Sequence, residues 1–225
     1  KTKMEQGDAY GMAAALGYGM DWNGDGKVLE WYDQAKAFEA HVVGKTAQEV
    51  KDMPTQVVEG AGYVISAEEA LLAAGCTIQI TDFKEAVAKA CEDAQGVTFK
   101  TSKTFTLGVA ADSFNDGSKD ATAEAAGAVQ VYSDFAASVV VDGKIVASLN
   151  DAIQPKFAVS TTGELTATYV ATKRELKEDY NMAKYGASMD WNKDGVVKEW
   201  YLQSAAFSKY VVGKTAQEVL DMPTH

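Results

Sequence analysis

Two short acidic segments hold the residues of this sequence that could do chemistry, and both have the spacing of a calcium loop. Counted from the first acid, oxygen-bearing side chains occupy positions one, three and five, a glycine follows at six, and a glutamate stands at ten. Alternate residues of such a loop point to a common centre, and the glycine permits the turn that brings the carbonyl of position seven inward. The pattern predicts a calcium ion in each loop, over residues 21–30 and 190–199. The expected ligands are Asp21, Asn23, Asp25, the carbonyl of Lys27 and Glu30 in the first loop, and Asp190, Asn192, Asp194, the carbonyl of Val196 and Glu199 in the second.

The same residues have a plainer interpretation, because Asp, Asn and Gly are also ordinary turn residues in loops without metal. Calcium is favoured because the ligand positions are kept in both loops, whereas spacer positions such as Gly24 and Lys193 differ. Magnesium fits less well, because so many protein ligands would displace the waters that it keeps. The ion is expected to be structural, since each loop directly precedes a long helix whose start it would fix.

The loops resemble the first part of an EF-hand or dockerin loop. They depart from it at position twelve, where an EF-hand has a bidentate glutamate and this sequence has Tyr32 and Tyr201. The glutamate at position ten is instead similar to the one that closes the short extracellular loops known as Excalibur motifs.

The sequence repeats itself over a long interval. Residues 42–50 recur at 211–219, and Asp-Met-Pro-Thr follows both, at 52–55 and 221–224. Upstream, Thr2 and Lys3 match Thr172 and Lys173, whereas Asp8 matches Asp179 one step out of register. Solenoid repeats recur every 20–50 residues or so, so this longer interval predicts tandem domains. Residues 57–95 and 97–171 have no counterparts, which predicts that the chain is a window cut out of a longer array.

The predicted elements separate into a helical half and a β half. Trp31, Ala35, Phe38 and Val42 have helical spacing, and residues 200–211 repeat the stripe. Residues 139–146 predict a β-hairpin around an Asp-Gly turn. Such segregation predicts an α+β fold of tandem modules, each with a helical half and an antiparallel β half. The expected boundaries are 1–95 for the helical half of the first module, 96–171 for the β half of the second, and 172–225 for its truncated helical half.

The two cysteines, Cys76 and Cys91, flank a β-prone run and the start of a helix. A strand going out and a helix returning would bring the sulfurs together, which predicts a disulfide and an oxidising compartment. The alternative is that both are small buried residues.

Composition narrows the possible partners. Of the 225 residues, 47% are hydrophobic, and the net charge is −11. The negative charge argues against nucleic acid, whose phosphates would be repelled. No apolar run approaches the roughly 18 residues of a membrane helix, so no transmembrane segment is predicted.

A wider resemblance concerns strings such as Gly7-Asp8-Ala9-Tyr10-Gly11-Met12 and Glu30-Trp31-Tyr32. They are similar to tandem-repeat modules of secreted or lipoprotein type in anaerobic Gram-positive bacteria, a group to which no activity is assigned. The hairpin at 142–146 is faintly similar to extracellular flavin-binding modules, although their Ser/Thr attachment motif is missing from the sequence.

These features favour an extracellular or cell-surface calcium-binding repeat module, with a structural, scaffold or ligand-binding role, over an enzyme. The expected partners are neighbouring modules of the same protein. Trp22 and Trp191 stand at an outward-facing loop position and are expected to contact a glycan, a peptide or a neighbouring module, unless the rings fold back on their own module. No catalytic residue is predicted, because neither copy offers a His or an unassigned acid kept in both. The alternatives are a flavin or small-ligand carrier and an unrecognised hydrolase.

Overall fold

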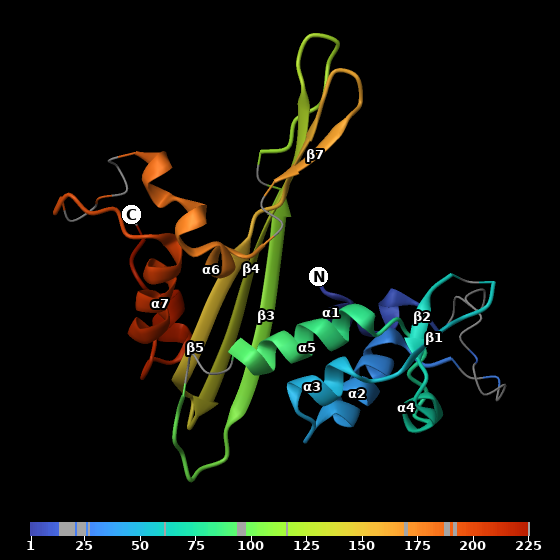
Figure 1. Cartoon of the computed structure of the whole chain (residues 1–225). Helices are drawn as coiled ribbons and strands as arrows, with labels where there is room; N and C mark the ends of the chain where they lie inside the picture. Colours follow the sequence, from blue (N-terminus) through green and yellow to red (C-terminus); the bar gives the residue numbers. More distant parts are fainter. Residues whose placement is uncertain are drawn as a thin grey trace. The chain divides into compact units, whose positions relative to one another are not determined.

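A computed structural model describes residues 1–13, 21, 26, 28–60, 62–93, 98–115, 117–168, 171–186, 190 and 193–224 of the chain. The chain divides into two compact units, Lys1–Gly96 and Val97–His225. Helices and antiparallel sheets occur together, which confirms the predicted α+β class (Figure 1). Across the described ranges, no helix is long and apolar enough to cross a membrane.

Unit 1 is mainly helical. Its elements are α1 (Lys3–Gln6), the 3₁₀ helix η1 (Gly7–Tyr10), α2 (Trp31–Val42), α3 (Ala47–Lys51), the strand pair β1 (Thr55–Val57) and β2 (Val64–Ser66), α4 (Glu69–Ala73) and α5 (Thr81–Asp93). The predicted stripe of α2 is confirmed, because Ala35 and Phe38 are buried in the core. The core also contains Val50 and Met53 from the α3 region, and Leu71, Cys76, Ile78 and Ile80 from the α4–α5 region.

Unit 2 combines a sheet with a second set of helices. Its strands are β3 (Thr106–Asn115), β4 (Gly127–Val141), β5 (Lys144–Ile153), β6 (Lys156–Val159) and β7 (Leu165–Thr168). Its helices are α6 (Lys173–Leu176), η3 (Lys177–Tyr180), η4 (Met182–Tyr185), α7 (Trp200–Tyr210) and α8 (Ala216–Leu220).

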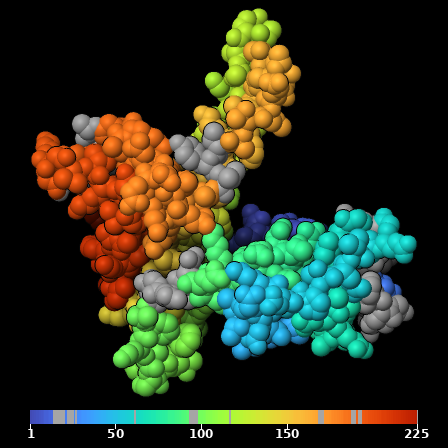
Figure 2. Space-filling view, in the orientation of Figure 1, coloured from blue at the N-terminus to red at the C-terminus, as the bar shows by residue number. Residues whose placement is uncertain are grey.

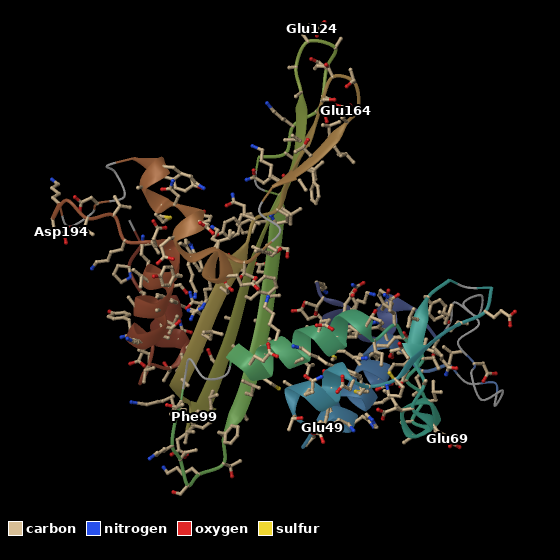
Figure 3. All side chains as sticks on the ribbon, viewed as in Figure 1. Glu49, Glu69, Phe99, Glu124, Glu164 and Asp194 are labelled. Atoms are coloured by element: carbon tan, nitrogen blue, oxygen red, sulfur yellow. The ribbon has the colours of Figure 1, made fainter. Side chains whose placement is uncertain are left out.

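The long strand β4 organises this sheet. Its later part pairs antiparallel with both β3 and β5, and its first residues pair with β6, which in turn pairs with β7. The predicted hairpin between β4 and β5 is confirmed. Asp142 and Gly143 both have positive φ, 50° and 76°, as a two-residue type I′ turn requires. The β6–β7 end extends as an arm beyond the helices of the unit (Figure 2), with Glu124 and Glu164 near its tip (Figure 3).

Helix α7 packs on β5 through polar anchors. The Ser204 hydroxyl donates a hydrogen bond to the Asn150 carbonyl at 2.7 Å, and Ser208 donates to the Asn150 side chain. Beyond the helix, the Gly213 N–H donates to the Ile145 carbonyl at 2.7 Å, and the Ile145 N–H donates to the Lys214 carbonyl at 2.9 Å. One side of α7 is therefore fixed against the sheet.

The other face of the sheet is apolar and exposed. Register places Val109 opposite Ala137 and Leu107 opposite Val139, and because side chains alternate along a strand, these residues share a face with Phe135. Leu107, Val109 and Phe135 are all exposed. Asn150, which receives α7, lies on the opposite face by the same alternation.

Candidate functional site

The structure describes part of each predicted calcium loop. In the first loop, Asp21 and Glu30 are described, whereas Asn23, Asp25 and Lys27 lie outside the described residues. In the second, Asn192 lies outside them. The described members there are Asp190, Asp194, Val196 and Glu199, and Asp194 is exposed (Figure 3).

The first acid of each loop binds the loop's own backbone. The Gly26 N–H donates to Asp21 Oδ2 at 2.9 Å, and the Gly195 N–H donates to Asp190 Oδ2 at 2.8 Å. Both glycines have positive φ, 76° and 81°, which the tight turn needs and which a side chain would disfavour. Asp190 Oδ1 also accepts from the Asp194 N–H at 3.2 Å, whereas Asp21 Oδ1 is buried and has no hydrogen-bond partner among the described residues.

The glutamate at position ten reaches back to an earlier segment rather than into the loop. Glu30 accepts hydrogen bonds from the N–H groups of Met12 at 2.9 Å and Ala13 at 3.0 Å, just after η1. Glu199 accepts from the Met182 N–H at 2.9 Å, just after η3. We call this contact the glutamate clasp. It ties the start of the long helix to the short helices before it.

These contacts correct the calcium prediction. Among the residues that the structure describes, no group of three or more His, Cys, Asp and Glu could hold a metal ion. In the second loop the three acids, Asp190, Asp194 and Glu199, are all described, and they do not form such a group. The physical reason is that each carboxylate accepts hydrogen bonds from backbone N–H groups. Asp190 and Asp194 accept from their own loop, with Asp194 accepting from the Val196 N–H at 2.9 Å, whereas Glu199 accepts from Met182 in an earlier segment.

The tyrosine at position twelve has a structural partner as well. The Tyr32 hydroxyl donates to Asp8 at 3.0 Å, and the Tyr201 hydroxyl donates to Glu178 at 2.9 Å. These hydrogen bonds raise the pKa of both tyrosines. Glu178, and not Asp179 as the sequence comparison predicted, is therefore the structural counterpart of Asp8.

A buried lysine forms the most enclosed charged site of unit 2. Lys173 is only 4% exposed, and its Nζ donates to the Tyr132 hydroxyl at 2.8 Å. Nζ also lies 4.3, 4.8 and 5.4 Å from the ring centroids of Tyr132, Tyr180 and Trp200, distances at which a cation is attracted to an aromatic face. Burial raises the pKa of the nearby Asp134, and Lys173 opposes that rise.

The first copy holds the matching lysine in a more open setting. Lys3 lies 4.9 Å from the Tyr10 ring and 5.4 Å from the Trp31 ring, and it is exposed. The difference is Tyr132, which β4 supplies in unit 2. Sequence reasoning assigned no role to either lysine, although their retention in both copies was the signal that could have revealed one.

A buried glutamine was missed in the same way. Gln34 is fully buried, and its Nε2 donates to the Leu29 carbonyl at 2.8 Å. Its Oε1 accepts from the Thr77 N–H at 2.8 Å, which joins α2 to the segment before α5. Its counterpart Gln203 is exposed and donates to the Lys198 carbonyl at 2.7 Å.

The predicted disulfide is wrong. Both cysteines are free, with Cys76 buried and Cys91 exposed. Cys76 is enclosed in the core between α4 and the buried residues Ile78 and Ile80, whereas Cys91 lies on the exposed side of α5. Burial raises the pKa of the Cys76 thiol to about 11. The predicted oxidising compartment rested on this disulfide, so that argument no longer holds.

Comparisons of this chain with protein-family models, curated proteins and solved structures found no match. Trp22 and Trp191, the predicted contacts for a glycan or peptide, lie outside the described residues.

Proposed function

We propose that this chain is a tandem-repeat scaffold or binding module, in which two copies of one helical cassette join other parts of the protein. We define cassette 1 as residues 2–55 and cassette 2 as residues 172–224. The neighbouring modules of the same protein are the proposed partners. The extracellular or cell-surface location and the resemblance to secreted repeat modules stay predictions from the sequence.

The observation that carries the proposal is the glutamate clasp, built at the same place in both cassettes. Each cassette begins and ends with the same local structures. Capping boxes, in which a threonine and a glutamate cap each other's backbone N–H, start α1, α3, α6 and α8. The position-twelve tyrosine bonds an acid of the preceding short helix in both. Two cassettes with the same internal bonds are what a repeated structural unit requires.

The hydrogen-bonded state of four cassette glutamates supports a structural role for these residues. A general acid or base needs a carboxyl group whose pKa lies near the working pH. Hydrogen bonds from backbone N–H groups instead lower the pKa of Glu5, Glu49 and Glu218, and in Glu178 a backbone bond and the Tyr201 hydroxyl do the same. These glutamates therefore stay ionised and bonded to their own cassettes.

Calorimetry of paired clasp variants tests the proposal. Tandem modules predict two unfolding transitions, one for each unit. Glu30→Gln should lower the melting temperature of one transition only, and Glu199→Gln that of the other only. Each substitution weakens a charge-assisted hydrogen bond, which contributes about 1.5–3 kcal/mol.

Glu164→Gln is the matched control, since Glu164 lies on the arm of unit 2 outside both clasps. It should shift neither transition. A single transition for the whole chain, or equal shifts of both transitions by either clasp variant, would contradict the modular scaffold.

A further inference from the structure

We infer that α7 and α8 present a docking site for one kind of occupant, a polypeptide segment with the apolar pattern of residues 64–93. The site, which we call the Phe207 face, consists of Trp200, Gln203 and Phe207 on α7, Val219 on α8 and Met222 just after α8. The inference rests on the proposed function, since it treats the two cassettes as copies.

The matching face of cassette 1 is covered. Phe38, the counterpart of Phe207, is 3% exposed, and its ring centroid lies 6.0 Å from that of Phe83 on α5. Phe83 also lies 5.8 Å from Trp31, the counterpart of Trp200. In cassette 2, Phe207 is 41% exposed. One aromatic side chain from an occupant would therefore fill the place between Phe207 and Trp200.

The loss of cover extends along the whole face. Val50 and Met53 are buried with Ile78 and Ile80 in the core of unit 1. Their counterparts Val219 and Met222 are only half-buried. An occupant with two apolar residues spaced like Ile78 and Ile80 would complete the same packing, and the contacts would exclude water from both helices.

A polar contact gives the site its register. In unit 1, the Thr77 N–H donates to Gln34 Oε1 at 2.8 Å, while Gln34 Nε2 holds the Leu29 carbonyl. Gln203 keeps the second of these bonds, to the Lys198 carbonyl. An occupant with a backbone N–H at the position of Thr77 would supply the first bond. A conserved pair of bonds of this kind would fix where an extended segment lies on the helix.

The differences between the cassettes specify the occupant further. In unit 1, Lys51 forms an ion pair with Glu92 at 2.7 Å, and His41 bonds Glu68. Cassette 2 has Leu220 in place of Lys51, and Leu220 is 78% exposed. Tyr210 replaces His41. The occupant should therefore carry an apolar residue where residues 64–93 have Glu92, and it needs no acid at the place of Glu68.

The Phe207 face is separate from the side of α7 that packs on the sheet. That side is anchored on β5 through Ser204 and Ser208. An occupant of the Phe207 face would thus leave the sheet contact intact.

The test joins a second copy of residues 56–93 to the full chain after Thr224, because Thr224 matches Thr55, which precedes that segment in unit 1. Amide hydrogen exchange is then measured over α7 and α8. Occupation should slow exchange in α8 at least tenfold, roughly 1.4 kcal/mol. Glu92→Leu in the added copy should slow it further. A scrambled extension of the same composition should have no effect.

Matched variants on α7 decide whether the protection comes from the Phe207 face. Phe207→Ser should abolish it, whereas Leu202→Ser should not, although Leu202 is as exposed at 46% and lies on the same helix. Circular dichroism checks that both variants stay folded. No added protection, or equal protection in both variants, would overturn the inference. Neither outcome changes the calorimetric transitions that test the scaffold proposal. The two proposals can therefore fail independently.

Discussion

The two cassettes share their internal hydrogen bonds but differ in what covers them. In cassette 1, the side of α2 that carries Gln34 and Phe38 is buried beneath residues 64–93. In cassette 2, the neighbouring side of α7, with Ser204 and Ser208, is buried on β5. The comparison separates two contributions to the fold. Caps and clasps follow from the local sequence, whereas burial follows from the segment that packs against each copy.

The two lysines also differ in burial between the cassettes, but here the residue of cassette 2 is the more buried one. Lys173 is buried and contacts Tyr132 on β4, whereas Lys3 is exposed and lies beside Tyr10 and Trp31. Among the described residues, cassette 1 therefore has no counterpart of the Tyr132 contact, and cassette 2 has no counterpart of the Phe83 contact. In the module that we propose, a sheet lies on one side of the long helix and a segment like residues 64–93 covers the adjacent side.

The largest effect is expected for the paired phenylalanines. Phe38→Ala should lower the free energy of unfolding of unit 1 by about 3–5 kcal/mol, because it leaves a cavity in a packed core. Phe207→Ala should change that of unit 2 by only about 0.5 kcal/mol, as for exposed positions. Urea denaturation with segment-resolved hydrogen exchange measures both. If the two substitutions lowered the free energy of unfolding by similar amounts, the proposed difference in cover between the cassettes would be contradicted.

The glutamines should show a smaller contrast. Gln34→Ala leaves the Thr77 N–H without its acceptor in the interior, which costs about 1–3 kcal/mol. Gln203→Ala removes an exposed contact and should cost under about 0.5 kcal/mol. The same denaturation experiment applies. A loss for Gln203→Ala as large as that for Gln34→Ala would show that cassette 2 is covered after all.

The capping boxes should respond alike in both cassettes. Thr46→Ala and Thr215→Ala should each cost about 1 kcal/mol, because each removes an N-cap acceptor. Backbone hydrogen bonds lower the pKa of Glu49 and Glu218 from 4.5, so the ionised forms stabilise the fold. That stability is present above about pH 4.5 and is lost as the pH falls through the lowered folded-state pKa. The threonine variants keep the backbone N–H, which lowers the pKa most, and lose only the hydroxyl, so they should lose slightly less stability than the native chain on acidification below about pH 4.5. If the native chain and the threonine variants lost the same stability on acidification, the threonine hydroxyls of the capping boxes would not contribute to the pH dependence.

The smallest effect is expected at Cys91. Because Cys91 is exposed and unbridged, Cys91→Ser should change stability by no more than about 0.5 kcal/mol. A thiol reagent should label one cysteine quickly in the native chain and both after unfolding. Cys76 should be the slow one, since it is buried and its pKa is raised to about 11. If neither cysteine reacted under denaturing, non-reducing conditions, the two would be joined by a disulfide, contrary to this expectation.

Local features could be predicted from the sequence. The stripe of α2, the Thr46–Glu49 capping box and the Asp142–Gly143 turn all depend on residues a few positions apart, so spacing alone determines them. The loop acids were misassigned for a physical reason. Capping a tight turn and binding a cation both place carboxylate oxygens on the inner side of a loop, so one spacing serves both.

The remaining features depend on distant segments. The buried Gln34 bonds Thr77, and the buried Lys173 bonds Tyr132. Neither partner is near in sequence, so no periodicity indicates the contact. The cysteines were misjudged likewise, because the side of α5 that faces the core is set by packing on α2 and α3.

Oxidative footprinting of the intact chain tests the central claim most directly, since Met53 and Met222 are counterparts that differ in cover. Met53 is buried in the core with Ile78 and Ile80, whereas Met222 is half-buried. The account predicts that Met222 oxidises faster than Met53. If the two methionines oxidised at equal rates, the claim that the two cassettes are covered differently would be contradicted.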